Sequence, residues 1–112
     1  MRTDDAAAVL LVEDDDETRA LLMRSLRRQG FRVPAAEDEG EAMEVAARER
    51  VGAVLTDLQM PALDALLARI RTSAALRGVP AFAVDGDAEE GPRGDGLHVL
   101  GGSHRLRELL RR

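Results

Sequence analysis

Short apolar runs alternate along the chain with segments of helical periodicity, and this alternation constrains the fold more than any other feature. The runs AVLLV (8–12), VGAVLT (51–56) and VPAFAV (79–84) have the length of buried strands. Between them, apolar residues recur every three or four positions, as on one face of a helix. This pattern favours an α/β fold with a parallel sheet, because each helix returns the chain to the same edge of the sheet.

The helical segments and one further strand have recognisable limits. Four acids, Glu13 to Asp16, precede the first predicted helix and would cap it, with Asp15 as the expected cap, and Gly30 would end it. FRVPA (31–35) is a weak strand that belongs at a sheet edge, because Pro34 has no N–H to donate. The inward-facing residues of the three helices are Leu22, Leu26 and Gln29 in the first, Ala42, Val45 and Ala46 in GEAMEVAARER (40–50), and Leu63, Leu66, Leu67 and Ile70 after Pro61.

The alternation fails after the fourth strand. DGDAEEGPRGDG (85–96) has four glycines, one proline and no apolar stripe, so it is expected to be a loop where a fourth helix would stand. LHVL (97–100) is a fifth strand, and Ser103 would cap a last helix that carries Leu106, Leu109 and Leu110. The loop leaves some apolar side chains of strands four and five without a covering helix, among Phe82, Val84, Leu97 and Val99. They would either form a partner surface or be covered by the loop folding back.

Composition excludes several classes of function. The chain has no cysteine, which excludes disulfides, thiolate metal sites and a cysteine nucleophile. Its 112 residues suit one domain, residues 1–112, and no apolar run approaches a membrane span of about 20 residues. The acidic start lacks the basic region of a signal peptide, so a cytoplasmic location is expected. A net charge of −5 and only two aromatic residues argue against direct nucleic-acid binding.

Three acids stand at the ends of two strands. Glu13 and Asp14 follow the first strand, and Asp57 follows the third. If these parallel strands are neighbours, their carboxyl ends bring the three carboxylates into one pocket at the place where open α/β sheets bind ligands. Carboxylate oxygens suit Mg²⁺, which would relieve their mutual repulsion. The alternative is that each acid is only a solvated strand end.

VLLVEDD (9–15) together with VLTDLQMP (54–61) resembles the receiver domain of two-component response regulators, over essentially the whole chain. The resemblance implies a flavodoxin-like, doubly wound, five-stranded parallel sheet in the order 2-1-3-4-5, here with the fourth helix missing or replaced by a loop. It implies that Asp57 is the phosphoacceptor and that Mg²⁺ is bound by Glu13, Asp14, Asp57 and the backbone carbonyl of Gln59. The implied partners are a sensor kinase or an output protein, with a possible homodimer through strand four, strand five and the last helix.

Three positions depart from the receiver pattern. Asp85 stands where receivers carry a Thr or Ser whose hydroxyl binds the phosphoryl group, and an ionised carboxylate cannot donate a hydrogen bond. Gly101, or its neighbour Gly102, stands where receivers carry a lysine, and this chain has no lysine. His98 or its neighbour falls at the aromatic switch position of strand five.

These departures predict an atypical, non-enzymatic receiver that acts as a protein-interaction module, with phosphorylation of Asp57 impaired or absent and with weak Mg²⁺ binding. The alternative is a receiver with Mg²⁺-dependent phosphorylation of Asp57 and an unusual output face. A phosphatase of the haloacid-dehalogenase type, which also uses an aspartyl nucleophile, would need an acid two residues after it, where this chain has Gln59.

Overall fold

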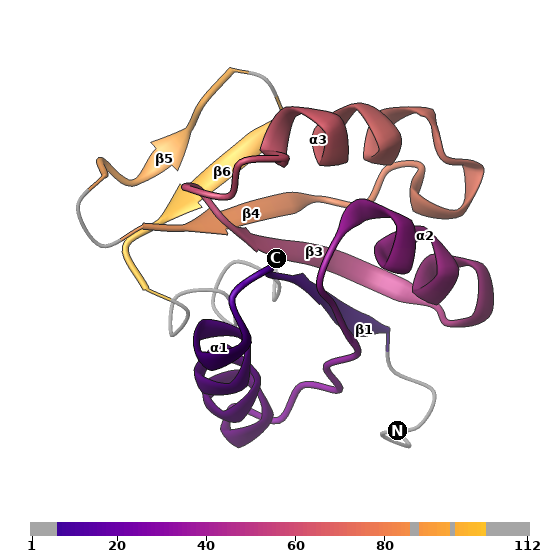
Figure 1. The fold of residues 1–112 in the computed structure, drawn as a ribbon. Helices are drawn as coiled ribbons and strands as arrows, with labels where there is room; N and C mark the ends of the chain where they lie inside the picture. Colours follow the sequence, from indigo (N-terminus) through magenta and orange to yellow (C-terminus); the bar gives the residue numbers. More distant parts are fainter. Residues whose placement is uncertain (1–6, 86–87, 95, 103–112) are drawn as a thin grey trace.

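The computed structural model describes residues 7–85, 88–94 and 96–102. Six strands form one sheet in the order β2-β1-β3-β4-β6-β5 (Figure 1). The strands are β1 (Ala8–Val12), β2 (Ala35–Ala36), β3 (Val51–Asp57), β4 (Ala81–Val84), β5 (Gly91–Pro92) and β6 (Leu97–Leu100). The helices are α1 (Asp16–Arg28), α2 (Glu39–Arg48), α3 (Leu63–Thr72) and the short 3₁₀ helix η2 (Ala74–Leu76).

The sheet has the predicted order and one strand more than predicted. β2, β1, β3, β4 and β6 run parallel and in the expected sequence, so the doubly wound fold is confirmed. β5 was not predicted. It consists of two residues inside the glycine-rich segment and pairs antiparallel with β6 at the edge of the sheet. The predicted last helix, from Ser103 onward, lies outside the described residues.

Local signals in the sequence set the limits of α1. The Asp15 carboxylate accepts a hydrogen bond from the Thr18 N–H at 2.8 Å, which satisfies one of the unpaired N–H groups at the start of the helix. Gly30 follows the last residues of the helix with φ +97°, a backbone conformation that glycine adopts without strain. The predicted cap and stop of this helix are therefore both confirmed.

β2 lies at the sheet edge, as Pro34 predicted, although only two residues pair as a strand. The carbonyl oxygens of Arg32, Pro34 and Ala36 accept hydrogen bonds of 2.9–3.0 Å from β1 and from the residue that follows it. Because these contacts use carbonyl groups, the missing N–H of Pro34 costs no hydrogen bond to β1.

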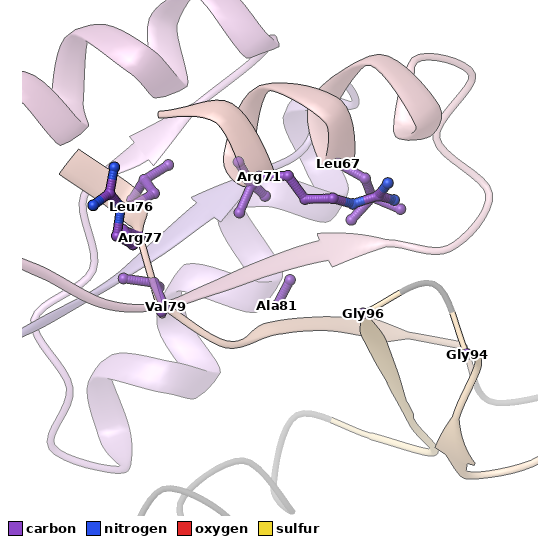
Figure 2. A pocket seen from close by; sticks show the side chains of 10 residues that line it. Leu67, Arg71, Leu76, Arg77, Val79, Ala81, Gly94 and Gly96 are labelled. Atoms are coloured by element: carbon purple, nitrogen blue, oxygen red, sulfur yellow. The ribbon is translucent and has the colours of Figure 1, made fainter. Parts of the chain in front are cut away.

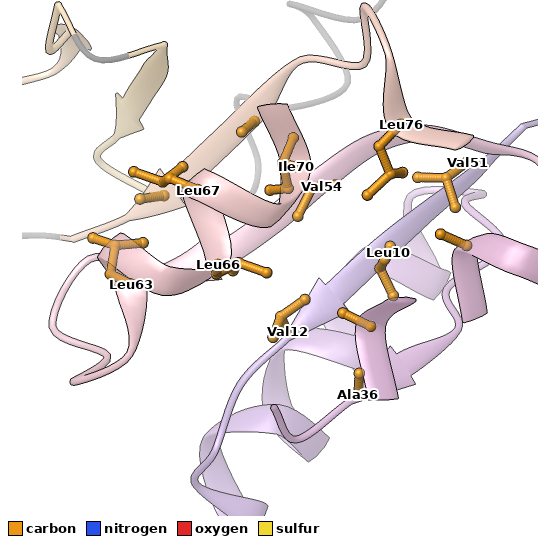
Figure 3. Packing of buried hydrophobic residues seen from close by; sticks show 14 of the residues in the cluster. Leu10, Val12, Ala36, Val51, Val54, Leu63, Leu66, Leu67, Ile70 and Leu76 are labelled. Atoms are coloured by element: carbon orange, nitrogen blue, oxygen red, sulfur yellow. The ribbon is translucent and has the colours of Figure 1, made fainter. Parts of the chain in front are cut away.

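The sheet separates two apolar clusters. On one face, α2 and α3 pack over Leu10, Val12 and Val54, as Figure 3 shows for the residues it labels. On the other face, α1 packs through Leu26 against Leu11 and its neighbours. All five residues of β1 are buried because both faces of the sheet are covered. The predicted inward faces of α2 and α3 are buried as expected.

No helix occurs among the described residues between β4 and β6, so the predicted loss of the fourth helix is confirmed. The structure contradicts the first alternative for this region, an exposed partner surface, and agrees with the second, in which the apolar side chains are covered. Phe82, Leu97 and Val99 are only 6%, 1% and 2% exposed, and Val84 is half-buried. Phe82 and Leu97 also belong to clusters on opposite faces of the sheet. Leu97 pairs with Ala81, the residue before Phe82, and successive side chains of a strand point to opposite faces. The segment folds back as β5 beside β6 (Figure 1).

Within the described part of the chain, no helix has both the length and the apolar composition needed to cross a bilayer.

Two leucines of α1 provide a matched test of this core. Leu26 is fully buried, whereas Leu21 is 57% exposed on the same helix. Leu26→Ala should lower the free energy of unfolding by about 2–5 kcal/mol, because it removes buried methyl groups and leaves a cavity. Leu21→Ala should change it by less than about 0.5 kcal/mol. Urea unfolding followed by circular dichroism measures both, and equal effects would contradict the assignment of the α1 face.

Candidate functional site

The parallel registers bring four carboxylates to one edge of the sheet. Val12 of β1 pairs with Thr56 of β3. The residues that follow them, Glu13 and Asp57, therefore lie side by side at the carboxyl ends of the two strands. Asp57 in turn pairs with Val84 of β4, and Asp85 follows directly. Asp14 follows Glu13 and is exposed. The predicted neighbourhood of strands one and three, on which the acidic site depends, is therefore confirmed.

Glu13 is the most unusual of these acids because it is only 1% exposed. Its Oε2 accepts a hydrogen bond from the Asp15 N–H at 3.0 Å, and its buried Oε1 has no partner. Burial and, to a smaller extent, the neighbouring Asp14 and Asp57 carboxylates raise the pKa of Glu13 to about 7, against the opposing effect of the Asp15 N–H. Near neutral pH this carboxyl group is therefore partly protonated.

Arg19 is a neighbour of the site that the sequence pattern did not predict. Its Nη1 donates a hydrogen bond to the Glu13 backbone carbonyl at 2.9 Å, and its Nη2 pairs with Asp16 one turn earlier. The spacing of Asp16 and Arg19 is a recognisable helix pair, but the contact with Glu13 depends on how α1 leaves β1. The arginine thus ties the first turn of α1 to the end of β1.

Asp57 stands at the end of β3 on a tight turn and is partly buried. Its Oδ1 accepts a hydrogen bond from the Gln59 N–H at 2.9 Å, and its backbone carbonyl accepts one from the Met60 N–H at 3.1 Å. The Leu58 N–H reaches the carbonyl of Val84, on the neighbouring strand, at 3.5 Å. These bonds orient the Asp57 carboxylate while leaving part of its surface open to solvent.

The Gln59 side chain makes a contact that we did not predict. Its Nε2 donates a hydrogen bond to Oδ2 of Asp85 at 2.8 Å. The two residues are 26 positions apart, so no local sequence signal could have revealed the pair. The Asp85 N–H donates to the Leu100 carbonyl at 3.0 Å, which attaches this position to the end of β6.

The position where receivers carry lysine has an acidic neighbour. Gly101 is exposed, and its N–H donates to Oε2 of Glu90 at 3.4 Å. Glu90 lies in the glycine-rich segment and was not singled out by the sequence. His98, at the expected switch position on β6, is half-buried and contacts Phe82 edge to face, with ring centroids 5.8 Å apart. The ring of His98 thus packs against a side chain of the neighbouring strand β4.

The acids at this edge of the sheet are suitable ligands for a hard cation, but their side chains are not spaced as a metal site. Their oxygen atoms are the ligands that Mg²⁺ prefers, and the unpartnered Oε1 of Glu13 is a buried acceptor. Among the described residues, however, no group of three or more His, Cys, Asp and Glu side chains is spaced as a metal centre. The oxygen ligands are therefore of the type that Mg²⁺ prefers, but their positions are not those of a preformed metal site.

A cavity of about 600 Å³ lies elsewhere, between α3, η2 and the turn that precedes β6 (Figure 2). Among residues 7–85, 88–94 and 96–102, its lining includes Arg71 and Arg77 but no carboxylate. Ala81, at the start of β4, lines it, whereas Asp85 follows the other end of that strand. This cavity is therefore separate from the acidic edge.

Doubly wound α/β domains bind ligands at the carboxyl ends of their strands, which is where the acids of this chain lie. The sequence pattern described as the response regulator receiver domain matches residues 9–97, and the chain therefore belongs to this family. It is accordingly a receiver domain of two-component signalling, a module that is not itself an enzyme. No curated protein sequence gives a significant match.

Solved receiver structures share the fold. The chemotaxis response regulator CheY4 of Vibrio cholerae is 22% identical, with a TM-score of 0.71 over 94% of this chain and 97% of that chain. The receiver domain of the sensor histidine kinase PA1611 from Pseudomonas aeruginosa PAO1 is 26% identical, with a TM-score of 0.69 over 96% and 97%. The latter structure has a magnesium ion coordinated in its active-site cleft.

The raised pKa of Glu13 predicts a pH dependence of stability. Because the pKa is about 7 in the folded protein and 4.5 as its ordinary value, folding favours the protonated form. The contribution of this group is fully present below about pH 4.5 and is lost as the pH rises through about 7. Glu13→Gln keeps an acceptor for the Asp15 N–H but cannot ionise. In metal-free buffer it should be more stable than the unmodified protein above pH 7, by a margin that shrinks toward pH 4.5.

Urea unfolding across this pH range measures the difference, with the exposed Glu44→Gln as the control. A margin for Glu13→Gln that stays constant with pH would contradict the assignment of the raised pKa.

Proposed function

We propose that this receiver acts as a protein-interaction module in two-component signalling, with phosphorylation of Asp57 impaired or absent. The main support for this proposal is the set of negative charges near the end of β3. Asp85 replaces the hydroxyl that would donate to a phosphoryl oxygen, and the Glu90 carboxylate lies beside Gly101, where an ammonium group would be. Ionised carboxylates only accept hydrogen bonds, and they repel a phosphoryl group.

The magnitude of the charge supports this proposal. If Glu13, Asp14, Asp57 and Asp85 are all ionised, one divalent cation leaves about two negative charges before a phosphoryl group arrives. Phosphoryl transfer depends on neutralising the charge that spreads over the transferred oxygens. Protonation of Glu13 relieves part of the repulsion, but it also removes an anionic ligand for the cation. Excess negative charge when Glu13 is ionised, and a weaker hold on the cation when it is protonated, each disfavour transfer to Asp57.

Mg²⁺ would be held by Glu13, Asp14, Asp57 and the backbone carbonyl of Gln59. When bound, it would neutralise charge on the donor and acceptor oxygens. We propose that its binding is weak, because Glu13 must lose a proton near neutral pH and because the carboxylates are not gathered in advance. The magnesium bound by the receiver domain of PA1611 supports the choice of cation.

The partner is proposed to be a sensor kinase or an output protein, as is general for receiver domains. A homodimer through β4, β6 and the last helix stays a prediction, because that helix lies outside the described residues. The second candidate function is a receiver that accepts phosphate at Asp57 and signals through an unusual output face. It is favoured by the position of Asp57 itself, which is partly open to solvent at the end of β3.

Intact mass spectrometry separates the two candidates. After incubation with acetyl phosphate and Mg²⁺, the proposed function predicts an unchanged mass, because Asp85 and Gly101 replace the hydroxyl and the ammonium group that would receive the phosphoryl oxygens. The Asp57→Asn variant is the matched control and should behave identically. A stoichiometric gain of one phosphate that is absent from Asp57→Asn would establish the second candidate instead.

Restoring the two missing donors should raise labelling. The variant with Asp85→Thr and Gly101→Lys supplies a hydroxyl and an ammonium group, and a side chain fits at Gly101, where an added Cβ would lie 3.7 Å from Oε2 of Glu90. Because that carboxylate would compete for the new ammonium, Glu90→Gln should be added. We expect labelling by acetyl phosphate to rise at least about tenfold, consistent with a gain of about 1.4 kcal/mol. The same variant with Asp57→Asn should stay unlabelled.

A further inference from the structure

We propose that Gln59 is a positioning residue that ties the Asp57 turn to Asp85, so that a contact independent of phosphate holds the loop after β3 against the end of β4. This inference rests on the proposed function and deepens it. In the family that the chain resembles, the group at position 85 would contact the phosphoryl oxygen. Here its carboxylate is already engaged by Gln59.

Gln59 donates a hydrogen bond to each of the two carboxylates. Its main-chain N–H bonds to Oδ1 of Asp57 at 2.9 Å, and its side-chain Nε2 bonds to Oδ2 of Asp85 at 2.8 Å. Two ionised carboxylates cannot bond to each other, since both are only acceptors. One residue with two donors can link them, and glutamine provides one donor from its backbone and another from its side chain.

The tie adds a short side-chain bond beside a long main-chain contact at this edge. The main-chain contact between the loop and β4, from the Leu58 N–H to the Val84 carbonyl, is 3.5 Å long, at the outer limit of a hydrogen bond. The 2.8 Å bond from Gln59 to Asp85 is shorter and has an ionised acceptor, which strengthens it. Gln59 therefore supplies the stronger of these two links.

The other end of the tie is anchored in the sheet. The Asp85 N–H donates to the Leu100 carbonyl at 3.0 Å, and Val84 pairs with Asp57 on one side and with Leu100 on the other. The Gln59 bond therefore connects the turn after β3 to the place where the ends of β4 and β6 meet. A loop held in this way has one preferred position before any phosphoryl group is present.

Amide hydrogen exchange by NMR tests the tie in the full chain, without phosphodonor or added metal. Gln59→Met has a similar length but no donor. It should speed exchange of the Leu58 amide about fivefold, which equals about 1 kcal/mol at 1.4 kcal/mol per tenfold change. Exchange at Leu10 in the core should be unchanged. The Asp85→Asn variant keeps an acceptor oxygen but loses the negative charge, so its Leu58 rate should lie between those of the unmodified protein and Gln59→Met.

A spectroscopic signature distinguishes the bond from general loosening of the loop. The side-chain amide protons of Gln59 should shift most when Asp85→Ala removes the acceptor, and less in Asp85→Asn, which keeps an acceptor oxygen. In the double variant of Gln59→Met with Asp85→Ala, the exchange of Leu58 should be no faster than in either single variant, because both remove the same bond.

Unchanged exchange in Gln59→Met would overturn the proposal. So would effects of the two single variants that multiply in the double variant, or an Asp85→Asn variant that exchanges as fast as Gln59→Met. The outcome is independent of phosphorylation, since no phosphodonor is present. Labelling of Asp57 by acetyl phosphate would overturn the proposed function while the exchange data could still support the tie.

Discussion

The parallel ladders that join β1, β3 and β4 are the constraint on which the rest of the structure depends. Their registers place the ends of the three strands at one level, with Glu13, Asp57 and Asp85 just at or beyond them. The ladders are stable because β1 and most of β3 are buried between two apolar clusters. The core therefore supplies the free energy that keeps like charges together at one edge.

That edge is unusual because of the chemistry that surrounds it. Glu13 is buried with one unpartnered oxygen, which raises its pKa to about 7 and makes a proton a competitor for any cation. The carboxylates of Asp85 and Glu90 accept hydrogen bonds from Gln59 and Gly101. The domain thus retains the scaffold of a receiver, and we propose that the carboxylates at positions 85 and 90 disfavour a phosphoryl group there.

Much of the fold could be predicted from local patterns. The buried runs at 8–12 and 51–56 and the stripe from Leu63 to Ile70 have the periods of a strand and a helix, and those periods reflect burial directly. β5 was missed because two residues, Gly91 and Pro92, have no strand-like pattern and pair only when β6 lies beside them. The sequence left open whether the apolar side chains of strands four and five are exposed or covered, because it does not show which way a glycine-rich segment turns.

The sequence by itself determined the types of group at the site: acids after two strands, Asp85 in place of a hydroxyl, and no lysine anywhere in the chain. Residue identities can be read directly from the sequence, and short-range apolar patterns show where the strands end. Only the tertiary structure decided which groups meet. The bond from Gln59 to Asp85 joins residues 26 positions apart, and the contact of Glu90 with Gly101 joins residues 11 apart. Both depend on how β4, β6 and their connecting segment come together, which no local pattern records.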